Sequence, residues 1–304
     1  MPTITGYVDD AAGAPAEGRT VRLYRRDTGA LLASGVTGPA AEVVGDASFA
    51  SVAALLPMTG TAGSTTFTDA KGNVWTAEGG AQISAGHSFF GSGAGHFDGD
   101  ARITTPHTAA LSLATGDFTI EFLVRFTTAG VNHVIVNKGL STGLYAYQVW
   151  VDSANQFGLR GFNVGGSLAY SILGGAMATG TDYFVSARRS GSTFSLHVNG
   201  TLIGTATSAD ALRSSDSDPL CVGAFSTGTA GFVGYMGQLR ITPGVVRPTT
   251  TPTKAWPTVV TAVPELLAGQ YSLATEYAGE VQRIVLDDAA GTLYNDLIDR
   301  VILS

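Results

Sequence analysis

Glu121 is the first residue to consider for hydrolytic chemistry, because it is a carboxylate inside an apolar segment, between Ile120 and Phe122. Glycoside hydrolysis needs carboxylates close together, one acting as nucleophile or base and another as proton donor. No second carboxylate follows Glu121 on the same segment at the spacing of a paired site. We therefore expect Glu121 to be a structural, outward-facing residue, and hydrolysis to be the least favoured activity.

The histidines are the next candidates, because imidazole nitrogens bind transition metals. Zinc sites usually show pairs of ligands at short, regular spacing, such as histidines four residues apart or a CxxC-like pattern. The five histidines show no such spacing, either among themselves or with Cys221, the single cysteine. We expect turn or edge positions for all five, which are His87, His96, His107, His133 and His197.

Residues 214–218 read Ser-Ser-Asp-Ser-Asp, so that hard oxygen donors alternate as they do in some calcium-binding loops. The segment lacks the glycine and the distal glutamate of an EF-hand loop. A solvated turn is therefore the favoured interpretation, and calcium on this loop is the alternative. No other cofactor is expected.

Three aromatic residues, Tyr145, Tyr147 and Trp150, lie close together after the glycine-containing residues 138–143. On an exposed sheet face, such rings can stack on sugar rings while neighbouring amide side chains bind hydroxyl groups. Successive strand residues face opposite sides, so at least half of these rings are expected in the core. The three residues are the candidate glycan-binding residues, and a core role is the competing interpretation.

The composition is that of a folded all-β protein. Of 304 residues, 44% are hydrophobic, 13% are charged and 40 are glycine, which favours short strands and turns over long helices. The net charge of −7 argues against a nucleic-acid partner. We expect no membrane insertion and folding in a cytoplasm, because neither a signal peptide nor a long apolar stretch is present. Cys221 lies in an apolar run and is expected to be a buried structural thiol.

Short alternating or apolar segments separated by turn residues predict many strands. Residues 117–126 alternate over almost their whole length, which predicts a half-buried antiparallel strand. Asn199-Gly200 predicts a tight hairpin flanked by His197 and Leu202. The proline-rich residues 247–257 predict an extended strap. The other predicted strands are 43–57, 67–69, 73–76, 81–83, 101–103, 134–138, 145–151, 157–162, 183–188, 194–198, 202–205 and 232–241.

The two ends of the chain read as halves of one small β-domain. Residues 3–38 and 270–304 each contain strand-like segments separated by glycines and polar turns, and the second segment supplies the strands that the first lacks, so the two ends must meet in space. We therefore predict a base domain formed by residues 1–38 and 258–304, into which residues 39–257 are inserted. Residues 258–304 contain seven acidic and two basic residues, so most of the net charge lies on the base.

Several motifs follow one another in a fixed order between residues 43 and 256: Leu55-Leu56-Pro57, Thr66-Phe67-Thr68-Asp69, Phe97-Asp98-Gly99, residues 116–122, Leu196-His197-Val198-Asn199-Gly200 and residues 234–241. In this order they resemble the laminin-G-like, concanavalin-type jelly-roll sandwich in the form common in bacteriophage tail and virion proteins. The outer segments contain Gly6-Tyr7-Val8, residues 19–29, Tyr271-Ser272-Leu273 and residues 286–300. They resemble a carboxypeptidase-regulatory-like, immunoglobulin-type sandwich, which the insert interrupts after Gly38.

The resemblance implies a non-enzymatic structural component of a tailed-phage virion, in the tail, the baseplate or a capsid decoration, located at the virion surface. Other virion proteins would bind the base domain, and the jelly roll would face solvent as a candidate for binding host-surface glycans. A symmetric multi-copy assembly or homo-oligomer is expected. The alternatives are a dedicated glycan-binding adhesin and, less favoured, a jelly-roll glycoside hydrolase.

Overall fold

The computed structural model describes residues 46–257, apart from 47, 92, 140–143 and 214–217, together with seven strands near the chain ends. The chain divides into two compact units. The terminal unit contains Met1–Gly45 and Thr261–Ser304, and the central unit contains Asp46–Val260. In both units the described elements are almost entirely strands, so the predicted all-β class is confirmed.

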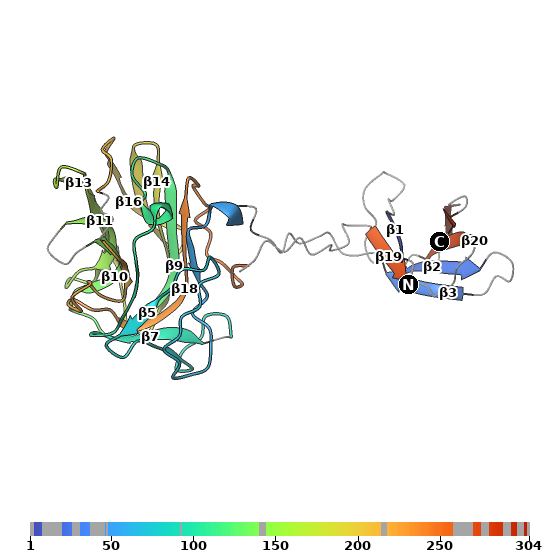
Figure 1. The fold of residues 1–304 in the computed structure, drawn as a ribbon, viewed down its shortest axis with the longest axis horizontal. Helices are drawn as coiled ribbons and strands as arrows, with labels where there is room; N and C mark the ends of the chain where they lie inside the picture. The colour runs from blue at the N-terminus through green and yellow to red at the C-terminus, as the bar shows by residue number, and fades with distance from the viewer. Residues whose placement is uncertain are drawn as a thin grey trace. The chain divides into compact units, whose positions relative to one another are not determined.

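In the terminal unit, strands from the two chain ends pair with each other (Figure 1). Strand β1 pairs with β19, and β2 lies between β3 and β20. The assignment of an immunoglobulin-like domain, with the boundaries 1–38 and 258–304, stays a prediction. The strands of this unit are β1 (Thr3–Tyr7), β2 (Thr20–Arg25), β3 (Leu31–Val36), β19 (Gln270–Ala274), β20 (Glu280–Asp287), β21 (Leu293–Asp296) and β22 (Val301–Ile302).

The central unit is a sandwich of two antiparallel sheets (Figure 1). The first sheet has seven strands in the order β13-β12-β11-β10-β17-β8-β5. Their bounds are β5 (Thr76–Glu78), β8 (Arg102–Thr105), β10 (His133–Gly139), β11 (Tyr145–Val151), β12 (Gln156–Phe162), β13 (Leu168–Ala176) and β17 (Leu220–Val222).

The second sheet has eight strands in the order β16-β15-β14-β9-β18-β7-β6, with β4 paired to β18 beside this path. Two short 3-10 helices, η1 (Phe49–Ser51) and η2 (Ala109–Leu111), lie outside the sheets. The strands are β4 (Ala54–Leu56), β6 (Gln82–Ser84), β7 (Ala94–Asp98), β9 (Phe118–Phe126), β14 (Asp182–Ser190), β15 (Thr193–Val198), β16 (Thr201–Thr207) and β18 (Val233–Pro243).

The main hydrophobic core lies between the two sheets and takes its side chains from both. Phe118, Phe122 and Phe126 of β9 enter it on one side, and Tyr147 and Phe157 enter it from β11 and β12. The inward side chains of the two sheets interdigitate, and this packing joins the sheets into one sandwich. Removing so much apolar surface from water is the main favourable contribution to the stability of this unit.

Most predicted strands are observed within one or two residues, and the Asn199-Gly200 hairpin is confirmed. Asn199 and Gly200 have φ angles of 49° and 80°, and His197 pairs with Leu202 as expected. Strands β7, β13 and β17 were not predicted, and among the described residues of the predicted strand 43–57 only Ala54–Leu56 forms a strand. Residues 67–69 form no strand, because the Asp69 side chain instead accepts hydrogen bonds from the Leu55 and Lys71 backbone and from the Trp75 indole.

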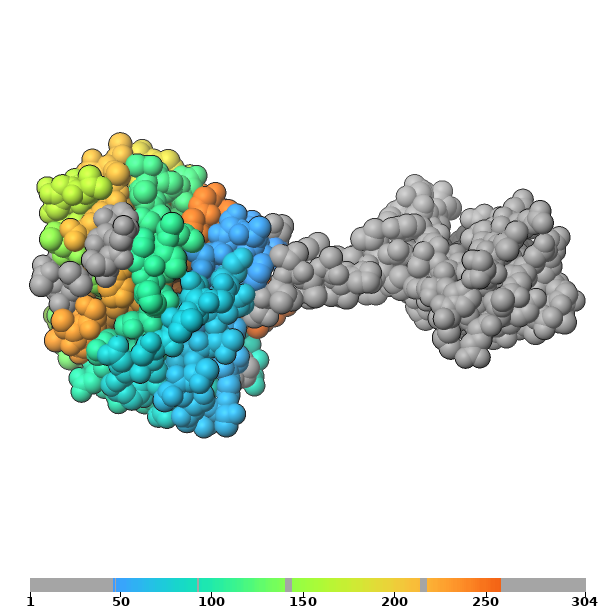
Figure 2. Space-filling view, in the orientation of Figure 1, coloured from blue at the N-terminus to red at the C-terminus, as the bar shows by residue number. Residues whose placement is uncertain are grey.

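The prediction that β9 is half-buried is wrong. Eight of its nine residues are buried, including those that face away from the main core. A second apolar cluster covers that outer face, and its covering side chains come from residues 49–55, from Trp256 and from the partly buried Ala70, Phe89 and Phe90. The cluster contains Phe49, Val52, Leu55, Leu123, Phe184 and Trp256. Figure 2 shows the blue residues after Asp46 close to the orange segment that follows β18.

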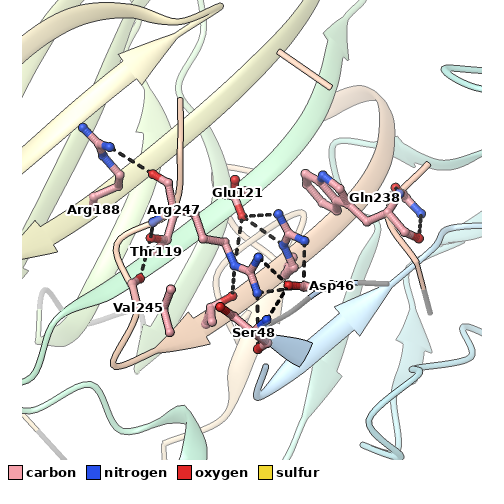
Figure 3. A network of polar contacts seen from close by, with 11 residues as sticks. Asp46, Ser48, Thr119, Glu121, Arg188, Gln238, Val245 and Arg247 are labelled. Atoms are coloured by element: carbon pink, nitrogen blue, oxygen red, sulfur yellow. Dashed lines mark hydrogen bonds and ion pairs between the residues drawn. The ribbon is translucent and has the colours of Figure 1, made fainter. Parts of the chain in front are cut away.

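Glu121 was expected to face solvent, and this expectation is also wrong. Its side chain is on the outer face of β9 but is only 3% exposed, and its Oε2 lies 2.8 Å from a terminal nitrogen of Arg240 (Figure 3). Asp46 accepts hydrogen bonds from Arg240 and Arg247, at 3.0 Å and 2.8 Å. The Arg240 guanidinium also lies 4.3 Å from the Trp256 ring centre. Ion pairs and ring contacts therefore hold both covering segments to the sheet.

Burial and neighbouring charge act in opposite directions on the two carboxylates. Burial raises the pKa of Glu121, and the nearby Arg240 and Arg247 only partly offset it. Burial also raises the pKa of Asp46, but hydrogen bonding to Arg247 and the charges of both arginines outweigh it, so the net pKa is lowered. Ionised Asp46 therefore stabilises the fold above its unfolded pKa, and this contribution is lost as pH falls through its folded pKa.

Glu121→Gln removes a carboxylate that is shared by two buried guanidinium groups, and we expect it to lower the free energy of unfolding by about 3–5 kcal/mol. Urea denaturation followed by tryptophan fluorescence measures this loss. The matched control is Glu78→Gln, because Glu78 pairs with Arg102 at side-chain exposures of 40% and 17%. The control is expected to cost about 1 kcal/mol or less, and equal losses in the two variants would contradict a special role for the buried network.

Candidate functional site

The three predicted glycan-binding residues all lie on β11, but they do not form one exposed cluster. Tyr147 is fully buried, packs against Phe118 with ring centres 6.4 Å apart, and donates a hydrogen bond to the Leu111 carbonyl at 3.2 Å. Burial raises the pKa of its hydroxyl. A ring in this position cannot stack on a sugar, so the core interpretation holds for Tyr147.

Tyr145 is 3% exposed and packs edge-on against Phe162 at 5.1 Å. Burial raises its pKa, although the positive charge of Arg160 acts in the opposite direction. The Arg160 guanidinium lies 5.1 Å from the Tyr145 ring centre. Tyr145 therefore packs against neighbouring side chains and has little exposed surface for a ligand.

Trp150 is partly exposed and lies over the backbone of Gly158 on β12. A Cβ atom added at Gly158 would be 2.2 Å from the indole Nε1, so only glycine leaves room for the ring. The Arg160 guanidinium lies 4.3 Å from the ring centre of Trp150, at the distance of a cation–π contact. The indole is therefore fixed by a glycine and an arginine of the neighbouring strand.

The register of β11, β12 and β13 assembles these residues into two adjacent rows on one face of the seven-stranded sheet. Residues directly opposite on antiparallel strands face the same side, as do residues two apart on one strand. The first row is Gln148, Arg160 and Ser171, and the second is Trp150, Gly158 and Leu173. We call these six residues the Arg160 patch.

Hydrogen bonds between side chains hold the first row in place. Arg160 donates from Nε to Gln148 Oε1 at 2.9 Å, and Gln148 donates from Nε2 to Asn137 Oδ1 at 3.0 Å. Asn137 in turn donates to the Gly139 carbonyl at 2.9 Å. Gln148 and Asn137 are fully buried, whereas Arg160 is partly exposed and Ser171 is exposed. In the Arg160 patch, buried amide side chains therefore hold in place groups that solvent can reach.

In chemical terms, the Arg160 patch can bind but offers no group for proton transfer. It presents part of an indole ring, the exposed Leu173 side chain at 47%, a hydroxyl and a guanidinium. Apolar surface beside a few fixed polar groups is the usual composition of a small-molecule or sugar site. Sequence reasoning found Trp150. It missed the other five residues, which only the strand register brings beside it: Gln148, Gly158, Arg160, Ser171 and Leu173.

The histidines do not all occupy turns or edges as expected. His133 is fully buried at the start of β10, and His197 is 8% exposed on β15, where its Nε2 lies 3.1 Å from Arg188. Burial lowers the pKa of both imidazoles, and the charge of Arg188 lowers that of His197 further. Among the residues described, no group of three or more histidine, cysteine or acidic side chains could hold a metal ion.

The possible calcium loop lies mostly outside the described residues, since 214–217 are not among them. Asp218 is described and buried, and its Oδ2 lies 3.5 Å from Arg213 Nε. Cys221 is a buried free thiol, as expected, and burial raises its pKa to about 12. In the described part of the chain, no helix is long and apolar enough to cross a membrane.

The sequence of residues 97–250 matches the concanavalin A-like lectin/glucanases superfamily, in its laminin G branch. The chain belongs to this superfamily. The match spans half of the chain, and it confirms the predicted concanavalin-type jelly roll for the central unit. No curated protein matches the chain by sequence.

Solved structures that are similar to this chain include a binding domain and a domain of a glycosidase. The binding domain of Paraclostridial mosquitocidal protein 1 has a TM-score of 0.50 at 14% identity, over 65% of this chain and 50% of that one. Domain 4 of AbnA, a GH43 extracellular arabinanase from Geobacillus stearothermophilus in complex with arabinotriose, has a TM-score of 0.49 at 15% identity, over 65% and 95%. The chain aligns with only half of the mosquitocidal binding domain, and at 14% identity the likeness to that domain shows the fold alone.

Gly158→Ala places a methyl group where the Trp150 indole lies, so we expect the ring to be displaced at a cost of about 1–3 kcal/mol in the free energy of unfolding. A shifted tryptophan emission spectrum at full folding would report the displacement. Gly116→Ala is the control, because the nearest atom to a Cβ at that position is 4.0 Å away. An unchanged spectrum and stability in Gly158→Ala would show that the indole does not lie over Gly158.

Proposed function

We propose that the central unit is a non-enzymatic carbohydrate-binding domain and that glycans bind at the Arg160 patch. The observation that carries this proposal is the fixed pair of Trp150 and Arg160, 4.3 Å apart on one sheet face and supported from beneath by buried amides. A sugar ring has apolar C–H faces and polar edges. It can therefore pack on the indole and Leu173 while its hydroxyl groups bind Ser171 and Arg160.

Binding without hydrolysis is proposed because Glu121, the carboxylate that invited an enzymatic interpretation, has another role. It lies in the eight-stranded sheet, is 3% exposed at the side chain and is engaged by Arg240. The two-carboxylate mechanism needs an accessible pair on either side of a glycosidic bond. The relatives that come from glycosidases do not change this proposal, since the likeness to them is one of fold.

The wider role that we propose is that of a structural protein on the surface of a tailed-phage virion. The central unit would be displayed to host glycans, and the terminal unit would attach to other virion proteins in a symmetric multi-copy assembly. Two features support this proposal: the resemblance of both segments to phage virion domains, and the pairing of strands from the two chain ends in one unit. A dedicated adhesin would use the same patch and would differ only in its place on the particle.

Trp150→Ala removes the ring that the proposal places against the sugar, and we expect it to weaken glycan binding about tenfold or more, which corresponds to about 1.4 kcal/mol. A glycan array followed by calorimetry on the best ligand measures the change. Val74→Ala is the control, because Val74 is an apolar side chain with 75% exposure outside the patch. Failure of the full-length protein to bind any glycan would refute carbohydrate binding.

The virion role predicts that this chain is present in many copies in purified phage particles. Mass spectrometry of particles purified on a density gradient should detect the intact chain, and antibodies to the central unit should label the particle surface in electron micrographs. Absence of the chain from particles that contain all other structural proteins would exclude this role, whatever the glycan array shows.

A further inference from the structure

We propose that the Arg160 patch selects acidic sugars, with Arg160 as the receptor for the carboxylate of a uronic or other sugar acid. This inference rests on the proposed function and specifies its ligand class. The guanidinium of arginine can donate two parallel N–H groups to the two oxygens of a carboxylate, which makes the contact both strong and geometrically selective.

Arg160 differs from the other arginines of the central unit in its partners. Eight arginines lie between residues 46 and 257, and seven of them are held by a carboxylate or by backbone carbonyl oxygens: Arg102, Arg125, Arg188, Arg189, Arg213, Arg240 and Arg247. Within the described part of residues 46–257, the Arg160 side chain makes its hydrogen bond through Nε, to Gln148. Among the described residues its two terminal nitrogens have no hydrogen-bond partner and no carboxylate within ion-pair distance.

The guanidinium is nevertheless held in a defined orientation. Gln148 and Asn137 fix it from beneath through two consecutive hydrogen bonds, and the rings of Trp150 and Tyr145 lie 4.3 Å and 5.1 Å from it. An arginine on an open surface would lose side-chain freedom when it bound a ligand, and this loss of entropy opposes binding. Much of this cost is already met in the folded protein, so a carboxylate meets a preorganised donor.

The groups around Arg160 suit the rest of an acidic sugar. Ser171 is its direct neighbour on β13 and exposes a hydroxyl, and Leu173 and Trp150 supply apolar surface in the adjacent row. Neighbouring strands are about 4.8 Å apart, so the three strands of the patch span about 10 Å, which is enough for one or two sugar rings. The carboxylate would lie over Arg160, and the ring over the apolar row.

The test measures binding of full-length wild type and Arg160→Gln to matched pairs of oligosaccharides, one with a uronic acid and one with the corresponding neutral sugar. We expect the wild type to bind the acidic member at least about tenfold more tightly, and Arg160→Gln to lose this preference while it still binds the neutral member. Arg160→Lys keeps the charge but not the paired donors, so its preference should be intermediate. Arg125→Gln, which removes a 32% exposed arginine from the other sheet, should leave the preference unchanged.

Two further measurements separate the possible outcomes. Raising the salt concentration should weaken binding of the acidic sugar more than that of the neutral one, because ions screen the charge pair. Sulfated oligosaccharides test whether any anion suffices, and equal or tighter binding of these would overturn the carboxylate assignment. Equal binding of acidic and neutral sugars would refute the inference alone, whereas absence of binding to every glycan would refute the proposed function as well.

Discussion

Cross-strand register decides which side chains meet in the central unit. In the seven-stranded sheet it sets Gln148 opposite Arg160 and Trp150 opposite Gly158. In the eight-stranded sheet the same rule sets Glu121 opposite Arg240, although 119 residues separate them in the sequence. A shift of one residue would turn each of these side chains to the other face of its sheet. The Arg160 patch and the buried ion pairs around Glu121 therefore both depend on strand register.

The two polar assemblies differ in what surrounds them. Glu121 and Arg240 are covered by side chains from segments before β4 and after β18, so their charges are neutralised within the protein. Arg160 is also held by a hydrogen bond, from its Nε to Gln148, but among the described residues its terminal nitrogens have no partner. Buried charges that pair with one another contribute to a fixed fold, while a fixed charge without a partner is available to a ligand.

Local patterns in the sequence were sufficient to predict most strands of the central unit, its hairpin at Asn199-Gly200 and the buried thiol of Cys221. These features depend on residues close together in the chain. The burial of the outer face of β9 could not be predicted, because its cover comes from residues far from β9 in the sequence, among them Phe49, Phe89 and Trp256. The site was only partly predictable. Trp150 was found by its residue type. Arg160 lay in a predicted strand, but the register of that strand with β11 was not predicted. The turn at Asp152 and Asn155 sets this register.

The segments that cover the outer face of the eight-stranded sheet determine where recombination can transfer this domain intact. Asp46 and Trp256 lie at its borders, and both bind to Arg240 on a central strand. A recombination event that transferred only residues 97–250 would leave the arginine without its carboxylate from the first border and without its indole from the second. Breakpoints that preserve a folded module must therefore fall before Asp46 and after Trp256, so the heritable unit is wider than the segment by which the superfamily is recognised.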